Sequence, residues 1–143
     1  MDLRVSTSYE GLATAKEAAG IVQKCVHCGF CNATCPTYQL LGDELDGPRG
    51  RIYLMKSMLE GNPVSEHTQL HLDRCLTCRS CESTCPSGVR YGRLLEIGRE
   101  VAEQQVRRSL KDRLVRFALR KIMTSRKWFG LLSRIGRWVK PVL

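Results

Sequence analysis

One spacing of cysteines occurs twice in this sequence of 143 residues and restricts its possible folds more than any other feature. The first run consists of Cys25, Cys28, Cys31 and Cys35, followed by Pro36. The second run begins fifty positions later and consists of Cys75, Cys78, Cys81 and Cys85, followed by Pro86. Together the runs hold all eight cysteines, and C-x2-C-x2-C-x3-C-P is the spacing of bacterial [4Fe–4S] ferredoxins. We therefore predict two [4Fe–4S] clusters.

The spacing also predicts which cysteines share a cluster. A cubane needs one thiolate on each of its four irons, and three cysteines at i, i+3 and i+6 can reach three corners of one cube. The fourth cysteine, before proline, points away, and in two-cluster ferredoxins it ligates the other cluster. We therefore expect crossed ligation, with Cys25, Cys28, Cys31 and Cys85 on cluster 1, and Cys75, Cys78, Cys81 and Cys35 on cluster 2.

Zinc is the alternative to iron and sulfide at these cysteines. Two zinc ions with four thiolates each would use the same eight side chains. Zinc ribbons pair two C-x2-C knuckles, however, and have no use for a third step or for the C-P ending, so the spacing favours iron–sulfur clusters. His27 and Arg79 lie inside the runs and are candidates for adjusting the cluster potentials. The alternative is that both side chains face solvent.

Helical patterns surround both runs, and no alternating strand pattern is present. Ser8 is the expected N-cap of a first helix that ends at Cys25. Residues 37–47 look irregular, and Pro48 is suited to the first turn of a second helix that stops at residues 61–63. The apolar face of that helix is expected to contain Ile52, Tyr53, Met55, Met58 and Leu59.

Two further helices complete the predicted all-α domain, which differs from the βαββαβ ferredoxins. Ser65 is expected to cap a helix with Leu70 and Leu72 inward. A last helix after Gly88 has the predicted inner face Leu94, Leu95, Ile97, Val101 and Ala102. Between these helices, Arg49 and Arg51 either lie beside a cluster or bind an acidic partner, or they pair with Asp43, Glu44 or Asp46.

The net charge of +9 is unevenly distributed along the sequence. Residues 1–106 hold 11 Lys/Arg and 13 Asp/Glu, whereas residues 107–143 hold 12 Lys/Arg and one acidic residue, Asp112. We therefore divide the chain into a dicluster domain, residues 1–106, and a basic amphipathic helical tail or linker, residues 107–143.

The tail has apolar residues at helical spacing and arginines on the opposite face. The expected apolar positions are Leu110, Leu114, Phe117, Ala118, Ile122, Trp128, Leu131, Leu132, Ile135 and Val139. Both tryptophans, Trp128 and Trp138, lie in this segment, which is typical of an amphipathic helix on anionic lipid. The alternative is packing against a further domain or a partner subunit. Nucleic-acid binding would also use basic charge, but no recognition motif accompanies it.

The sequence contains no sign of export or of a catalytic site. Residues 1–10 are polar, and no window approaches about 20 apolar residues, so we expect a cytoplasmic protein, peripheral on the inner face of the membrane if the tail binds lipid. The three histidines, His27, His67 and His71, do not combine with carboxylates at a catalytic spacing. Substrate chemistry is therefore expected in a partner.

Two stretches carry a resemblance to a known family. They are KCVHCGFCNATCPTYQLLGDELDGPRGRIYLMKSMLEGN, residues 24–62, and HLDRCLTCRSCESTCPSGVRYGRLLEIGREVAEQ, residues 71–104. Both resemble the iron–sulfur subunit of bacterial glycolate oxidase (glycolate dehydrogenase), notably through residues 41–51. The wider family includes iron–sulfur subunits of lactate-utilisation, anaerobic glycerol-3-phosphate dehydrogenase and heterodisulfide reductase systems. Its members continue into two further cysteine-rich domains, whereas this sequence has no ninth cysteine.

The resemblance implies an α-helical ferredoxin that relays electrons. The donor would be a flavin subunit that oxidises a 2-hydroxy acid, here glycolate, and the acceptor would be the membrane quinone pool. The equivalent relay for lactate or glycerol-3-phosphate remains open. A hypothesis of a different class is a non-redox, metal-stabilised adaptor that docks enzyme subunits to the membrane.

Overall fold

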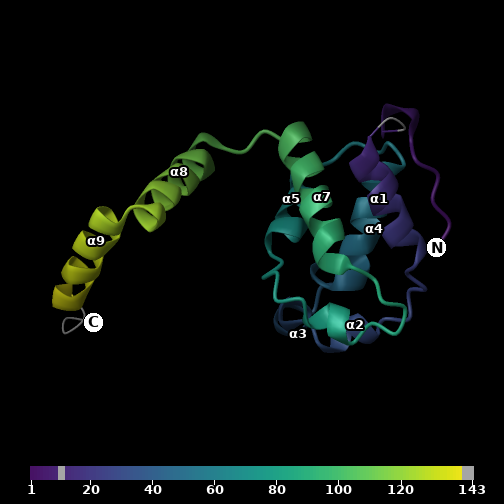
Figure 1. Cartoon of the computed structure of the whole chain (residues 1–143), viewed down its shortest axis with the longest axis horizontal. Helices are drawn as coiled ribbons and strands as arrows, with labels where there is room; N and C mark the ends of the chain where they lie inside the picture. The colour runs from purple at the N-terminus through teal and green to yellow at the C-terminus, as the bar shows by residue number, and fades with distance from the viewer. Residues whose placement is uncertain (10–11, 140–143) are drawn as a thin grey trace. The chain divides into compact units, whose positions relative to one another are not determined.

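The computed structural model describes residues 1–9 and 12–139, without the side chains of Trp138 and Val139. In these residues all the regular structure is helical (Figure 1). The predicted all-α fold is therefore confirmed. The chain divides into two units, and the boundary follows Val106. We describe the two units separately.

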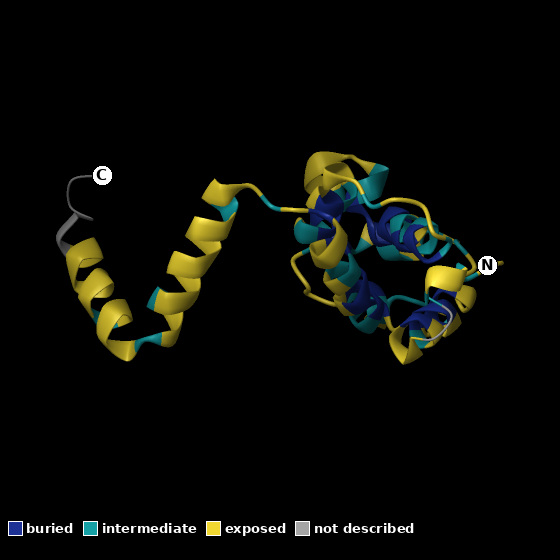
Figure 2. Cartoon of the chain, turned by 90° about the horizontal axis from the view of Figure 1, so that it is seen from above, coloured by how far each residue is buried: buried dark blue, intermediate teal, exposed yellow. Residues whose placement is uncertain are grey.

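Four helices enclose the core of the first unit. They are α1 (Ala13–Gln23), α4 (Pro48–Leu59), α5 (Glu66–Asp73) and α7 (Tyr91–Gln105). Helix α7 contacts each of the other three, and α4 also contacts α1 and α5 (Figure 1). The buried apolar residues of these helices form one core cluster, and the ribbon of buried residues is dark blue in Figure 2. Burial of this apolar surface is the main favourable contribution to folding.

The predicted helix faces are largely correct. On α7, Leu94, Leu95, Ile97 and Ala102 are buried and Val101 is partly buried. On the two preceding helices, the predictions for Tyr53 and Leu70 are wrong, because these side chains are 56% and 45% exposed. Each residue of an α-helix is turned by about 100° from the one before it. Tyr53 is one step from buried Ile52 and Leu70 is two steps from buried Leu72, so both point away from the buried face.

The expected N-cap at Ser8 is wrong. Ser8 lies inside a short 3-10 helix, η1 (Thr7–Tyr9), and α1 begins after Leu12, which makes no side-chain cap. The backbone N–H of Ser6 donates to the carbonyl of Leu59 at 2.9 Å. This bond ties the N-terminal segment to the end of α4, so that segment does not continue into α1. The cap at Ser65 is confirmed, since its Oγ accepts from the N–H of Thr68 at 3.1 Å.

Residues 37–47, expected to be irregular, contain helix α3 (Pro36–Leu41) and the 3-10 helix η2 (Glu44–Asp46). Pro36 occupies the first turn of α3, where its missing N–H costs nothing. Gly42 ends α3 in the left-handed conformation, with φ 68°, and its N–H donates to the carbonyl of Tyr38 at 2.9 Å. Both signals were present in the sequence. Helix α4 begins at Pro48, as predicted.

The second unit begins at Arg107 and contains α8 (Leu110–Thr124) and α9 (Arg126–Val139). Ser109 caps α8, because its Oγ accepts from the N–H of Asp112 at 3.2 Å. Most of the large apolar residues of both helices are exposed, and the ribbon of both helices is mainly yellow in Figure 2. The predicted helical tail is therefore confirmed, although the side chains of Trp138 and Val139 lie outside the described residues. No described helix has the length and hydropathy to cross a membrane.

The close approach of η2 to the start of α4 depends on Gly50. A methyl group on Gly50 would overlap the backbone carbonyl of Glu44. We expect Gly50→Ala to destabilise the protein by about 1–3 kcal/mol, the usual range for overpacking. The measurement is the midpoint of urea unfolding of the reconstituted protein.

Gly20 provides the matched control. It is exposed on α1, and a methyl group there meets no atom within 4 Å. Because alanine favours helix more than glycine does, Gly20→Ala should stabilise by about 0.5–1 kcal/mol. Equal effects at the two positions would contradict the importance of the close approach.

Candidate metal centres

The two cysteine loops have the same local conformation. Each loop follows a helix, and the N–H of Cys25 and that of Cys75 donate to the carbonyls of Val22 and Leu72, at 3.0 and 3.3 Å. Two positions further on, His27 and Thr77 have positive φ angles of 55° and 54°. Such angles are uncommon for residues other than glycine, so their recurrence fifty positions apart indicates that the repeat is structural.

The left-handed conformation recurs again two residues later. Gly29 has φ 85° and Arg79 has φ 60°. Each precedes a single-turn helix, α2 (Phe30–Ala33) and α6 (Ser80–Ser83) respectively. Helices α2 and α6 contact each other, and Thr34 Oγ1 donates to the carbonyl of Ser80 at 3.5 Å. The fold thus places the two cysteine loops side by side.

Two cavities open between these loops. The first is partly open to solvent, and its cysteines are Cys25, Cys28, Cys31, Cys81 and Cys85. The second is also partly open, and its cysteines are Cys35, Cys75, Cys78 and Cys81. The structure therefore brings Cys85 to the first loop and Cys35 to the second, while Cys81 borders both cavities. Which thiolate binds which iron stays a prediction.

The thiols suit a cluster with soft, positively charged metal ions. All eight cysteines are free of disulfides. Burial and the neighbouring Cys25 raise the pKa of the Cys31 thiol to about 11, and burial and the neighbouring Cys31 raise the pKa of Cys81 to about 12. In metal-free protein these thiols keep their protons, and iron would replace those protons. The donor set therefore fits two [4Fe–4S] clusters.

The two tuning candidates lie in different surroundings. His27 borders the first cavity with its Nε2 buried, and this atom has no hydrogen-bond partner among the described residues. Its ring meets the Tyr53 ring edge-on at 4.6 Å between centroids. Burial and then the Arg49 charge lower the pKa of His27 and favour a neutral ring. Arg79 is largely exposed and pairs with Glu82 at 2.8 Å. The solvent-facing alternative thus fits Arg79 but not His27.

The predicted pairing of Arg49 and Arg51 with nearby acids is confirmed, and a position beside a cluster or a partner stays a prediction. Each arginine pairs with a nearby acid, Arg49 with Glu44 at 2.6 Å and Arg51 with Asp46 at 3.3 Å. Each also borders a cavity, Arg49 the first and Arg51 the second. The two sites differ in burial, because Arg49 is about one-third exposed while the side chains of Arg51 and Asp46 are 0% exposed.

Arg51 lies at the centre of a buried polar network. Its Nε donates to the backbone carbonyl of His71 at 2.7 Å. One terminal nitrogen donates to Thr37 Oγ1 at 3.1 Å and the other to Asp46 Oδ1 at 3.3 Å. Arginine suits this position because its planar guanidinium presents several donors in fixed directions. The network joins α3, η2, α4 and α5.

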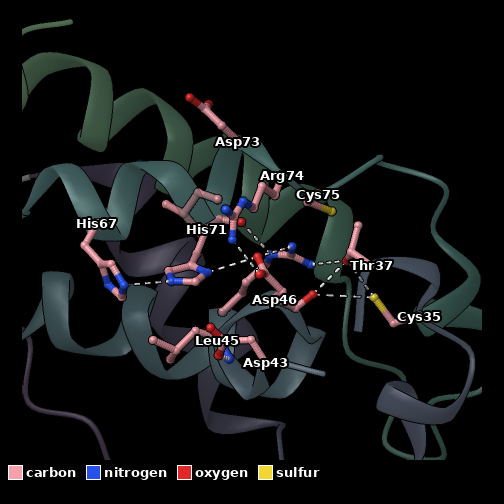
Figure 3. Close-up of polar contacts among 12 residues, drawn as sticks. Cys35, Thr37, Asp43, Leu45, Asp46, His67, His71, Asp73, Arg74 and Cys75 are labelled. Atoms are coloured by element: carbon pink, nitrogen blue, oxygen red, sulfur yellow. Dashed lines mark hydrogen bonds and ion pairs between the residues drawn. The ribbon is translucent and has the colours of Figure 1, made fainter. Parts of the chain in front are cut away.

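Asp46 binds two further side chains from α5 and its C-cap. Its carboxylate lies 2.9 Å from His71 Nδ1 and 2.9 Å from an Arg74 nitrogen, and His71 Nε2 lies 3.2 Å from His67 Nε2 (Figure 3). Burial raises the pKa of Asp46, but hydrogen bonds from His71 and Arg74 outweigh it, and the net effect lowers the pKa. Asp46 therefore stays ionised. The sequence did not reveal the roles of His67 and His71.

The network reaches a cysteine through Thr37. Thr37 Oγ1 donates to the backbone carbonyl of Asp46 at 2.7 Å and lies 3.2 Å from Cys35 Sγ. On the other side of the second cavity, the Tyr91 hydroxyl donates to Cys75 Sγ at 3.8 Å. Burial raises the pKa of Tyr91, so this hydroxyl keeps its proton. Two cysteines of the second cavity thus have hydroxyl neighbours.

Asp46 offers a test of the network. Asp46→Ala would leave the Arg51 guanidinium buried without its counter-charge, and removal of one partner of a buried pair costs about 3–5 kcal/mol. We expect a loss of this size in the free energy of unfolding of the reconstituted protein. The control is Glu96→Ala, which removes a largely exposed partner of Arg93 and should have no measurable effect. Similar losses for both variants would show that the network is not a special source of stability.

The sequence of the chain is similar to a known domain family and to two known proteins. Residues 21–89 match the family of the 4Fe-4S dicluster domain. The whole chain is 61% identical to the glycolate oxidase iron–sulfur subunit of Escherichia coli (strain K12) and covers 35% of it. Over 99 residues, 68% of the chain, it is 46% identical to the probable glycolate oxidase iron–sulfur subunit of Bacillus subtilis (strain 168) and covers 22% of it. No solved structure matches the chain significantly.

These matches confirm the resemblance seen in the sequence. The chain spans about a third or less of the length of these curated relatives. Two [4Fe–4S] clusters, as predicted, fit this dicluster domain, and its eight free cysteines stay the predicted ligands. Residues 21–89 are therefore a 4Fe-4S dicluster domain, and the whole chain is a relative of the glycolate oxidase iron–sulfur subunits.

Proposed function

We propose that this chain relays electrons in a flavin-dependent 2-hydroxy-acid dehydrogenase whose substrate is glycolate. The observation that carries the proposal is the pair of thiol-lined cavities, which lie side by side in a dicluster domain. The names of the two relatives support glycolate as the substrate of the complex. A flavin-containing subunit would supply the electrons, and the membrane quinone pool would receive them.

The cavities are close enough to form one relay. Pro48, Cys81 and Tyr91 border both of them. Clusters bound there would be separated by little more than side chains, which suits rapid electron exchange. The chain itself holds a metal-binding thiol set and a buried structural network, so oxidation of the hydroxy acid belongs to the flavin-containing partner. The oxidoreductase role of this chain is that of a subunit.

We further propose that the ligation is crossed. Cys85 borders the first cavity with Cys25, Cys28 and Cys31, and Cys35 borders the second with Cys75 and Cys78. Helices α2 and α6, which end just before Cys35 and Cys85, contact each other. This contact supports an exchange of the fourth ligand between the loops. Crossing would join the two halves of the repeat through metal–sulfur bonds.

Metal content separates this function from the adaptor hypothesis. Anaerobically reconstituted protein should hold about 8 iron and about 8 sulfide per chain, the content of two cubanes. After dithionite reduction, electron paramagnetic resonance should show two magnetically interacting clusters. A colourless protein with bound zinc and no such signal would contradict the relay and support a metal-stabilised adaptor.

Serine variants test the crossed assignment. Cys85→Ser should damage the cluster of the first loop, so its remaining spectrum should match that of Cys28→Ser. The matched comparison is Cys78→Ser, which removes a ligand within the second loop. If the spectrum of Cys85→Ser instead matches that of Cys78→Ser, each loop holds its own cluster and the crossing is wrong.

We also infer that the second unit binds anionic lipid on the cytoplasmic face of the membrane. The exposed large apolar side chains on α8 and α9 include Leu114, Phe117, Trp128, Leu131 and Ile135. By helical spacing, arginines that include Arg120 and Arg134 lie on the opposite face, and each contributes about 1 kcal/mol near an anionic surface. The alternative is that these apolar side chains pack against another part of the complex.

Vesicle sedimentation tests the lipid contact with the full chain. We expect binding to vesicles that contain phosphatidylglycerol and little binding to pure phosphatidylcholine. The double variant Arg120→Glu/Arg134→Glu should weaken binding by at least about tenfold, because it reverses two charges. The control Lys16→Glu on α1 should bind like the parent protein. Failure of the parent protein to bind anionic vesicles would favour the protein-packing alternative.

A further inference from the structure

The two cluster sites differ in what faces their ligating sulfurs. In the second cavity, Cys35 Sγ lies 3.2 Å from the Thr37 hydroxyl, and Cys75 Sγ accepts from the Tyr91 hydroxyl at 3.8 Å. In the first cavity, Cys31 Sγ lies 3.9 Å from the side-chain oxygen of Asn32. A ligating thiolate accepts hydrogen bonds but cannot donate them, so the two hydroxyls are favourable neighbours and the amide oxygen is not.

The Thr37 hydroxyl is polarised by a buried cation. Arg51 donates to Thr37 Oγ1 at 3.1 Å from a side chain that is 0% exposed. In the metal-free protein the threonine proton is directed to the carbonyl of Asp46 at 2.7 Å. When Cys35 is a thiolate, the Sγ atom becomes the stronger acceptor within reach, since it carries negative charge. A line of donors then runs from Arg51 through Thr37 to Cys35.

Arg51 is only partly neutralised by its partner. The Asp46 carboxylate is shared with Arg74 and with His71, each at 2.9 Å. Asp43 also lies near this group, but it is exposed and water screens its charge. In the first cavity, Arg49 is about one-third exposed and forms a separate pair with Glu44. Positive charge is therefore less screened beside the second cavity.

We propose that the cluster at Cys35, Cys75, Cys78 and Cys81 has the higher reduction potential of the two, and that Thr37 and Tyr91 raise it as positioning residues. The inference rests on the proposed cluster assignment and goes beyond it by giving the relay a direction. Reduction adds one electron and one negative charge to the site, and no bond forms or breaks. Donors to the sulfurs and nearby positive charge stabilise the reduced form. The electron therefore comes to rest at the second site.

One feature of the first cavity would raise the reduction potential of the first cluster instead. His27 Nε2 is buried there without a partner among the described residues, so a neutral ring protonated on Nε2 would donate to that cluster. The second site has two hydroxyls, of Thr37 and Tyr91, and the fully buried guanidinium of Arg51. These three groups outweigh the single histidine in their effect on the reduction potentials.

The repeat supplies a matched pair of variants for the test. Ser87 follows Cys85-Pro86 as Thr37 follows Cys35-Pro36, and it borders the first cavity. Thr37→Val keeps the shape of the side chain and removes the hydroxyl. The experiment is a dithionite titration of the reconstituted full chain, in which the two midpoint potentials are followed by electron paramagnetic resonance.

Thr37→Val should make reduction of the higher-potential cluster about tenfold less favourable, which is a 59 mV lower midpoint for one electron. The lower midpoint should not move. Ser87→Ala should leave the higher midpoint unchanged, and Tyr91→Phe should lower it. If Thr37→Val fails to assemble one cluster, the surviving cluster should be the one of lower potential.

Three results would overturn the inference while leaving the relay intact. They are two clusters of equal potential in the parent protein, a shift of the lower midpoint in Thr37→Val, and a shift of the higher midpoint in Ser87→Ala. A parent protein without iron or signal would instead refute the relay itself. The two failures are therefore distinguishable.

Discussion

The buried ion pair between Arg51 and Asp46 is the interaction on which the arrangement of the first unit depends. Two charges removed from water are stable only when further hydrogen bonds satisfy their remaining donors and acceptors. Thr37, His71 and Arg74 provide these bonds from α3, α5 and the α5 C-cap. The pair thus fixes the segment that carries Cys35 beside the helix that leads to Cys75. This arrangement supports the proposed crossed ligation, because Cys35 and Cys75 border the same cavity.

Much of the fold could be predicted from local sequence signals. The cysteine spacing located the two loops, and the proline after each run marked where the chain leaves the loop. Pro48 and Ser65 marked helix starts, because both act within one turn of the chain. Helix α3 was missed although Pro36 begins it and Gly42 ends it, because the helix has only six residues. Short helices have weak periodicity.

The polar network could not be predicted, because its partners are distant in the sequence. Asp46 and His71 are 25 positions apart, and their hydrogen bond exists only after α5 packs beside η2. Pairing with nearby acids is one of the two alternatives that the sequence offers for Arg49 and Arg51, yet sequence does not distinguish the partly exposed Arg49 pair from the buried Arg51 pair. Burial depends on the whole fold. That difference in burial separates the electrostatics of the two cavities.

The central claim is that the fourth cysteine of each run serves the other loop. An anaerobic crystal structure of the protein with both clusters bound tests this claim most directly. We predict iron–sulfur bonds from Cys35 to the cluster of Cys75, Cys78 and Cys81, and from Cys85 to the cluster of Cys25, Cys28 and Cys31. A structure in which Cys35 ligates the cluster of its own loop would contradict it.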